Sequence, residues 1–142
     1  MRKTVISHVA FGCASALLAS SVTYLAQGQP APSTGLRQTE LFKTKMDDVL
    51  GRVVTVRRTE RDPGNGSAPH RHPGSHTIGY VLEGTYEVKV GDGPLRKLGP
   101  GETFYEPPGA LHAVSRNASS TQAVKYLVIQ ISDPTKPQSV PE

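Results

Sequence analysis

Four of the five histidines in this chain lie in two short segments. His70, His72 and His76 stand close together, and His112 follows further along the chain. Imidazole is the commonest protein ligand for iron, zinc, copper and nickel. The four side chains therefore predict a metal site, provided that the fold brings the two segments together.

The spacing of the first two histidines suits a shared ligand position. Side chains at i and i+2 of a strand point to the same face, so His70 and His72 are expected to aim at one point while Arg71 points away. His112 follows a stiff turn at residues 107–109, Pro-Pro-Gly, which delivers it from elsewhere. Three imidazoles leave further positions of an ion open, as in catalytic sites. The alternative is that these histidines only hydrogen-bond within a polar loop cluster.

Short β-strands are the predicted elements that carry these residues. Segments rich in β-branched and aromatic residues alternate with glycine- and proline-rich turns roughly every 8–12 residues. The expected strands cover residues 52–57, 77–82, 85–90, 103–105, 113–115 and 124–131. No long amphipathic helical pattern lies between them. This arrangement predicts an antiparallel all-β sandwich or small barrel.

The first part of the chain resembles an export signal. Within residues 1–28, Arg2 and Lys3 precede an apolar stretch from Val5 to Leu25, and small residues at 26–28 offer a cleavage site. The alternative is an uncleaved anchor helix, because about 20 apolar residues span a bilayer. Several serines make the stretch weakly apolar, so we expect cleavage, release to the periplasm or the medium, and no membrane attachment afterwards.

Three further segments complete the expected organisation of the 142 residues. Residues 29–50 are expected to form a linker and an irregular N-terminal segment, with an irregular or helical turn over residues 40–49. Residues 51–132 are the expected barrel domain. The tail, residues 133–142, contains three prolines and is expected to be flexible.

Composition narrows the chemistry and the partners. The only cysteine, Cys13, lies in the export segment, so a metal site in the mature domain must use nitrogen and oxygen ligands. The formal net charge is +4, and the basic residues near position 60 are interleaved with acidic ones. Nucleic-acid binding needs clustered charge of one sign, so we expect no nucleic-acid partner.

The first histidine segment resembles the first motif of the cupin superfamily. That motif has a glycine, five residues, His-x-His, three or four residues, a glutamate, six residues and a glycine; Gly64, His70, His72 and Gly84 occupy matching positions. The second segment resembles the second cupin motif in the spacing of its glycine, Pro-x-Gly and histidine, with its asparagine one residue late. The matching residues of the second motif are Gly101, Pro107, Gly109, His112 and Asn117.

The resemblance implies a single antiparallel jelly-roll β-barrel, in agreement with the strand pattern. It also implies one divalent metal ion and a small-molecule ligand inside the barrel. We expect a homodimer, because cupins often pair and a short chain buries a modest core.

The chain departs from the first motif at the glutamate. With three residues after His72 the position falls on His76, and with four it falls on Thr77. Strand alternation favours Thr77, which would share an inward face with Val81. Ligand chemistry favours His76, which a bulge at residues 73–75 would turn inward. We therefore expect His76 as a fourth ligand, with a rim position that binds substrate as its alternative.

An all-imidazole set carries no charge and suits iron(II), manganese, nickel, copper or zinc. His76, Tyr105 and Glu106 are candidates for acid–base catalysis, since the last two directly precede the prolines of the second motif. Tyr105 and Glu106 could instead be packing or surface residues, so no catalytic residue is assigned. The resemblance implies metal-dependent oxygenase, isomerase or lyase chemistry, in which the ion polarises a bound oxygen atom or dioxygen. The alternative is a non-catalytic binding or sensor module on the same barrel.

Overall fold

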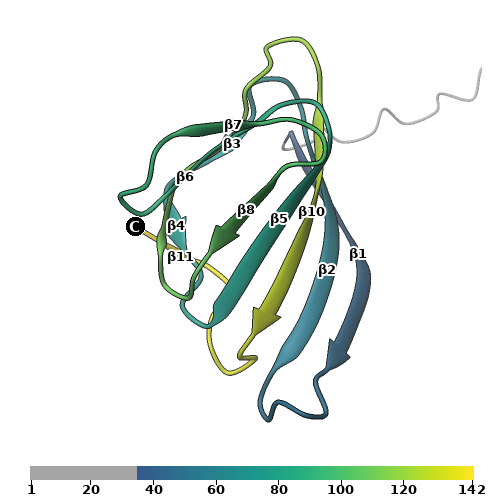
Figure 1. Cartoon of the computed structure of the whole chain (residues 1–142), viewed down its shortest axis with the longest axis vertical. Helices are drawn as coiled ribbons and strands as arrows, with labels where there is room; N and C mark the ends of the chain where they lie inside the picture. Colours follow the sequence, from purple (N-terminus) through teal and green to yellow (C-terminus); the bar gives the residue numbers. More distant parts are fainter. Residues whose placement is uncertain (1–34) are drawn as a thin grey trace, which may run out of the picture. The chain divides into compact units, whose positions relative to one another are not determined.

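The computed structural model describes residues 35–142, which form an all-β unit (Figure 1). The predicted export signal, residues 1–28, and the start of the predicted linker lie outside the described residues. Within residues 35–142 no helix is long and apolar enough to cross a bilayer.

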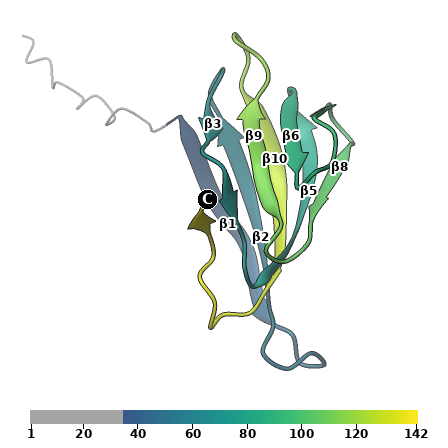
Figure 2. The ribbon, with the colours of Figure 1, turned by 90° about the vertical axis from the view of Figure 1, so that its left-hand side faces the viewer.

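Two antiparallel sheets make up the unit. The first has the order β1-β2-β10-β5-β8 and the second β11-β4-β9-β6-β7, with β3 also paired to β9 (Figures 1 and 2). This confirms the expected jelly-roll barrel. The strands are β1 Leu36–Lys45, β2 Val53–Arg61, β3 Gly66–Ser67, β4 His70–Arg71, β5 Ser75–Glu83, β6 Tyr86–Val90, β7 Arg96–Leu98, β8 Thr103–Glu106, β9 Leu111–Asn117, β10 Val124–Ser132 and β11 Val140–Pro141.

Strand β1 corrects the expected irregular segment over residues 29–50. It pairs with β2 along its whole length, from Leu36 opposite Arg61 to Lys45 opposite Val53. Nearly all its side chains are exposed, because it is an edge strand. Because neither face of β1 is buried, its sequence has no alternation of apolar and polar residues that would predict a strand. Backbone hydrogen bonds to β2 define this strand instead.

The C-terminal segment is also more ordered than expected. Figure 1 shows it, in yellow, running from the end of β10 back to β4, where β11 pairs with Arg71 and His70. The Arg71 guanidinium donates to both carboxylate oxygens of Glu142, at 2.8 and 3.0 Å. Proline is compatible with a short strand at a sheet edge, so the prolines of residues 133–142 do not prevent this pairing.

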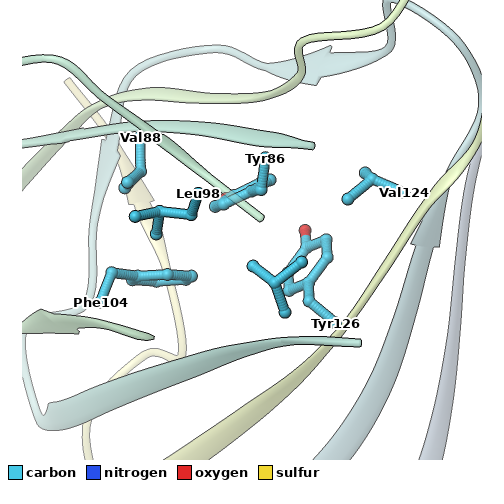
Figure 3. Packing of buried hydrophobic residues seen from close by; sticks show 7 residues of the cluster. Tyr86, Val88, Leu98, Phe104, Val124 and Tyr126 are labelled. Atoms are coloured by element: carbon cyan, nitrogen blue, oxygen red, sulfur yellow. The ribbon is translucent and has the colours of Figure 1, made fainter. Parts of the chain in front are cut away.

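Inward-facing residues divide the barrel interior into an apolar and a polar part. The apolar cluster contains Val81, Tyr86, Val88, Leu98, Phe104, Val124 and Tyr126, whose side chains pack against one another in Figure 3. Towards the other end of β5 and β10 the inward positions carry polar side chains, such as Thr77 and its cross-strand partner Gln130. The polar part adjoins the histidines.

Tyr86 is the largest fully buried side chain of the apolar cluster. Its ring centroid lies 4.5 Å from that of Tyr126, and its hydroxyl is 2.6 Å from Ser115 Oγ. Burial raises the pKa of Tyr86 well above its ordinary value of 10.0, and burial also raises the pKa of Tyr126.

The raised tyrosine pKa values predict a loss of stability in alkali. The unfolded chain releases these protons from about pH 10, whereas the folded chain retains them, so the free energy of unfolding falls as the pH rises above about 10. Tyr86→Phe is expected to lower stability at pH 7 by about 1 kcal/mol through the lost hydrogen bond, and to make the alkaline decline shallower. Thermal melts between pH 7 and pH 11 test this, and parallel declines in both proteins would contradict it.

Candidate metal centre

Three histidines converge on one point of the barrel interior. His70 lies on β4 directly opposite His112 on β9, and His72 follows the end of β4. Each imidazole offers one nitrogen, and the three nitrogens all lie within 4.8 Å of one another. The ring centroids of His72 and His112 are each 5.0 Å from that of His70. These three histidines can hold a metal ion.

Backbone carbonyls orient two of the rings. His70 Nδ1 donates to the carbonyl of Ala68 at 2.8 Å, and His72 Nδ1 donates to the carbonyl of Gln138 at 2.5 Å. With the proton held at Nδ1, each Nε2 carries a free lone pair, as a metal ligand requires. Burial lowers the pKa of His70 below its ordinary value of 6.5, which favours the neutral imidazole that binds metals.

Glu106 adds a carboxylate to this cluster. On β8 the side chains of Phe104 and Glu106 face inward, and Glu106 is only 2% exposed. One carboxylate oxygen lies 3.1 Å from His112 Nδ1 and the other lies 3.8 Å from His72 Nε2. The three histidines that can hold an ion form an all-imidazole set, and Glu106 places a carboxylate directly beside it.

Unpartnered polar atoms show that this set fits a cation. Among the described residues Glu106 Oε2 and His112 Nε2 are buried without a hydrogen-bond partner, and His112 Nδ1, although 3.1 Å from Glu106 Oε1, forms no well-aligned hydrogen bond. Buried polar atoms in folded proteins nearly always have a partner, and an unpaired buried carboxylate is strongly unfavourable. A divalent ion bound to three imidazoles and this carboxylate would satisfy Glu106 Oε2 and one nitrogen of His112.

His76 does not join the cluster, which corrects its expected role as fourth ligand. It faces the other side of β5, where His76 Nδ1 lies 2.7 Å from Tyr105 Oη. Tyr105 is half exposed on the same outer face, so it does not face the cavity either. Thr77 is the inward residue, 2% exposed, because the strand keeps its regular alternation and no bulge rotates His76.

Thr77 lies directly opposite Glu106 in the pairing of β5 with β8. The carboxylate beside the histidines therefore belongs to β8, the strand next to that of Thr77. Glu106 was a candidate acid or base in the sequence, and the structure places it against the histidines.

The cluster opens into a cavity of about 310 Å³. Its walls combine the histidines and Glu106 with aromatic side chains such as Phe104 and Tyr126, and with polar side chains such as Arg57 and Gln130. In the sequence Arg57 belongs to the mixed charged run near position 60, which does not by itself predict an inward side chain. Its position two residues from Thr55 and Thr59, on the buried face of β2, is the signal that would have placed it inside.

Comparison with known proteins identifies the family. The family model described as Cupin domain matches residues 57–130, more than half of the 142-residue chain. The chain belongs to the cupin family. No curated protein matches it at a significant level.

Solved structures with a similar fold are consistent with this family assignment. A recombinant oxalate oxidase in complex with glycolate is 26% identical with a TM-score of 0.57, over 80% of this chain and 58% of that one. The DMSP lyase DddQ from Ruegeria pomeroyi is 25% identical with a TM-score of 0.54, over 62% of this chain and 42% of the lyase. KdgF from Halomonas sp. shares the fold at 21% identity and a TM-score of 0.57, over 72% of this chain and 85% of KdgF. This cupin thus spans about half the length of the first two proteins.

The C-terminal segment orients His72, because the backbone carbonyl of Gln138 accepts a hydrogen bond from His72 Nδ1. Deleting residues 138–142 removes the carbonyl that holds His72 Nδ1 and the pairing of β11 with β4. We expect zinc affinity to fall by about 10- to 100-fold, the usual effect of losing a group that orients a ligand. Competition with a chromogenic chelator measures it. Gln138→Ala is the matched control, because it keeps the backbone carbonyl and should retain affinity; a folded deletion variant with unchanged affinity would refute the role.

Proposed function

We propose that this cupin binds one divalent metal ion through His70, His72, His112 and Glu106, and that it acts on a small molecule in the adjoining cavity. The observation that carries the proposal is the convergence of three histidine nitrogens within 4.8 Å of one another, beside a buried Glu106 oxygen without a partner. When bound, the ion supplies a Lewis acid that polarises an oxygen atom of the substrate.

The protein's own side chains prepare this position. Carbonyl partners fix the His70 and His72 rings, and the inward carboxylate of Glu106 lowers the net charge of a divalent site to +1. Phe104 packs beside His112, with ring centroids 5.9 Å apart, and limits access of water from the core side. Such a preorganised, partly dry site strengthens electrostatic interactions with a bound substrate.

The similar structures support an enzyme. One is a DMSP lyase and another is an oxalate oxidase in complex with glycolate, and both names concern small molecules. One observation favours the second candidate, a non-catalytic binding or sensor module. Glu106 is the only carboxylate among the described residues that line the cavity, so with Glu106 as a ligand no second carboxylate remains there as a general base.

Elemental analysis of protein purified from its native compartment tests the metal proposal. We expect about one iron, manganese, nickel, copper or zinc per chain, lost on treatment with a chelator and regained on reconstitution. Protein that takes up none of these ions would overturn it. Metal-dependent oxygen uptake or absorbance change with small phenolics, keto acids or sugars would identify an enzyme, whereas binding without turnover would identify the sensor module.

Export remains part of the proposal. The basic start and apolar stretch of residues 1–28 support release to the periplasm or the medium. Fractionation with N-terminal sequencing tests it. A mature chain beginning near residue 29 outside the cytoplasm is expected, and an intact N-terminus in the membrane fraction would favour the anchor instead.

We also propose that two copies pair through the outer face of the five-stranded sheet. An apolar row crosses all five strands in direct register: Phe42, Val56, Ile129, Ile78 and Tyr105. The outer face of an antiparallel sheet that meets water is normally polar, and Phe42 and Tyr105 are 53% and 51% exposed. A second copy of the same uncharged row covers it without burying charge.

Light scattering after size exclusion tests the pairing. We expect a dimer, and Ile129→Lys should give a monomer that still binds metal, because this side chain points away from the cavity. The exposed Arg96→Gln, on β7 of the other sheet, is the control. A monomeric wild-type protein at micromolar concentration would contradict the proposal.

A further inference from the structure

A second group in the cavity, the guanidinium of Arg57, has the character of a ligand anchor. Arg57 lies on the inward face of β2, on the same side as the buried Thr55, Thr59 and Arg61. It is half-buried and lines the cavity that also contains His72, His112 and Glu106. The outward neighbour, Arg58, is exposed.

The hydrogen-bond partners of Arg57 are neutral, although Glu40 stands opposite it on β1. Its Nη1 donates to Gln130 Oε1 at 2.7 Å, and the Gln138 amide lies beside it, where its oxygen can accept at 2.8 Å once the amide is turned round. Both partners are neutral amides. Among residues 35–142 no carboxylate forms an ion pair with Arg57. A guanidinium has five N–H donors, so several remain for a ligand.

Arg61 differs from Arg57 although both face inward. It is 4% exposed and donates to Tyr126 Oη, Asn65 Oδ1, Ser67 Oγ and Ser115 Oγ, at distances from 2.7 to 3.3 Å. These bonds occupy its donors and tie β2 to its neighbours. Arg61 therefore adds positive charge to the interior, whereas Arg57 adds both charge and free donors.

The summed charge of the cavity favours an anion. Glu106 is its only carboxylate among the described lining residues, and the proposed divalent ion more than neutralises it. With Arg57 and Arg61 the occupied site is strongly positive. Guanidinium groups bind carboxylates through paired, charge-assisted hydrogen bonds, which strengthen away from bulk water.

The wall between Arg57 and the histidines is polar on one side, where Gln130 bonds Arg57 and Thr77 stands opposite Glu106, and apolar on the other. Val128 is the cross-strand partner of Arg57, and Tyr126 and Phe104 continue the lining toward His112. We propose that the ligand of this site is a small carboxylic acid with an apolar, aromatic or branched body. Its carboxylate binds Arg57, its body packs on Val128, Tyr126 and Phe104, and a further oxygen reaches the metal position. The proposal rests on the proposed function for its metal end and for part of the positive charge of the occupied cavity.

Calorimetry with benzoate and its neutral counterpart benzamide tests the carboxylate end. We expect both metal-free and zinc-loaded protein to prefer benzoate. Arg57→Gln should weaken benzoate binding by about 10- to 100-fold, the usual weight of a charged hydrogen bond, and abolish the preference over benzamide. Arg58→Gln, an exposed change on the same strand, should leave both affinities unchanged.

Measurements on metal-free protein test the carboxylate anchor independently of the metal proposal. Benzoate binding that depends on Arg57 in metal-free protein supports the inference even if no metal binds. Equal affinity of wild-type and Arg57→Gln protein for benzoate would overturn it, as would equal binding of benzoate and benzamide by the wild type. Zinc affinity and melting temperature of Arg57→Gln, both expected to match the wild type, show that the variant is folded.

Discussion

Zinc is expected to raise the melting temperature of this cupin by about 15 °C or more, and a chelator should reverse the rise. A ligand at a thousand times its Kd stabilises the folded state by about 4 kcal/mol, and each kcal/mol shifts the midpoint of a small domain by roughly 4–8 °C. The metal-free protein buries Glu106 and His112 atoms without partners, so the folded state gains most when an ion satisfies them. Thermal melts by circular dichroism, with excess zinc or with EDTA, measure the shift.

Two histidine variants test which residues the zinc-dependent shift of the melting temperature requires. His112→Ala removes a buried member of the cluster and should abolish the zinc-dependent shift. His76→Ala is the matched control, because His76 hydrogen-bonds Tyr105 on the opposite face of β5 and should keep the full shift. Identical melting of the wild-type protein in zinc and in EDTA would contradict the assignment of the site.

Local patterns in the sequence predicted much of the barrel and three members of the cluster. The His-x-His pair and the Pro-x-Gly turn before His112 depend on neighbouring residues, so their spacing alone places them. Strand alternation likewise predicts that Thr77 faces inward, because it lies four residues, or two periods of the strand, before the inward Val81. The prediction of His76 as a ligand is wrong. Side chains of β5 alternate between the two faces without a bulge, so His76 points outward however well an imidazole suits a metal.

Glu106 and Gln138 could not be assigned in the same way, because their places depend on contacts between distant strands. Glu106 reaches the histidines only because β8 pairs with β5, and Gln138 only because β11 returns to β4. Strand order is a property of the sheet and leaves little trace in a single segment. Edge strand β1 is the extreme case, since its exposed residues have no alternation to detect.

Replacing Glu106 by glutamine should lower zinc affinity by about 100-fold, the upper end of what losing an orienting partner alone produces. Glutamine keeps the shape of the side chain but removes the negative charge that a divalent ion requires. The metal-free variant should melt no lower than the wild type, because the glutamine amide can still face His112 and the buried Oε2 without a partner no longer carries charge. Opposite effects on the metal-free and zinc-loaded forms distinguish a ligand from a residue that only supports the fold. Glu83→Gln, an exposed change, is the control.

The pairing of Thr77 with Glu106 permits a stricter test of the same assignment. Residues directly opposite in an antiparallel pair have Cβ atoms about 5 Å apart and point to the same face, so a carboxylate on either strand reaches the same region. The double variant Thr77→Glu with Glu106→Thr exchanges the two side chains and should recover at least about 10-fold of the zinc affinity lost in Glu106→Gln. Chelator competition on all three proteins measures the recovery. If the exchanged protein folds but binds zinc no better than Glu106→Gln, the carboxylate acts only from β8, and a place shared across the strand pair is excluded.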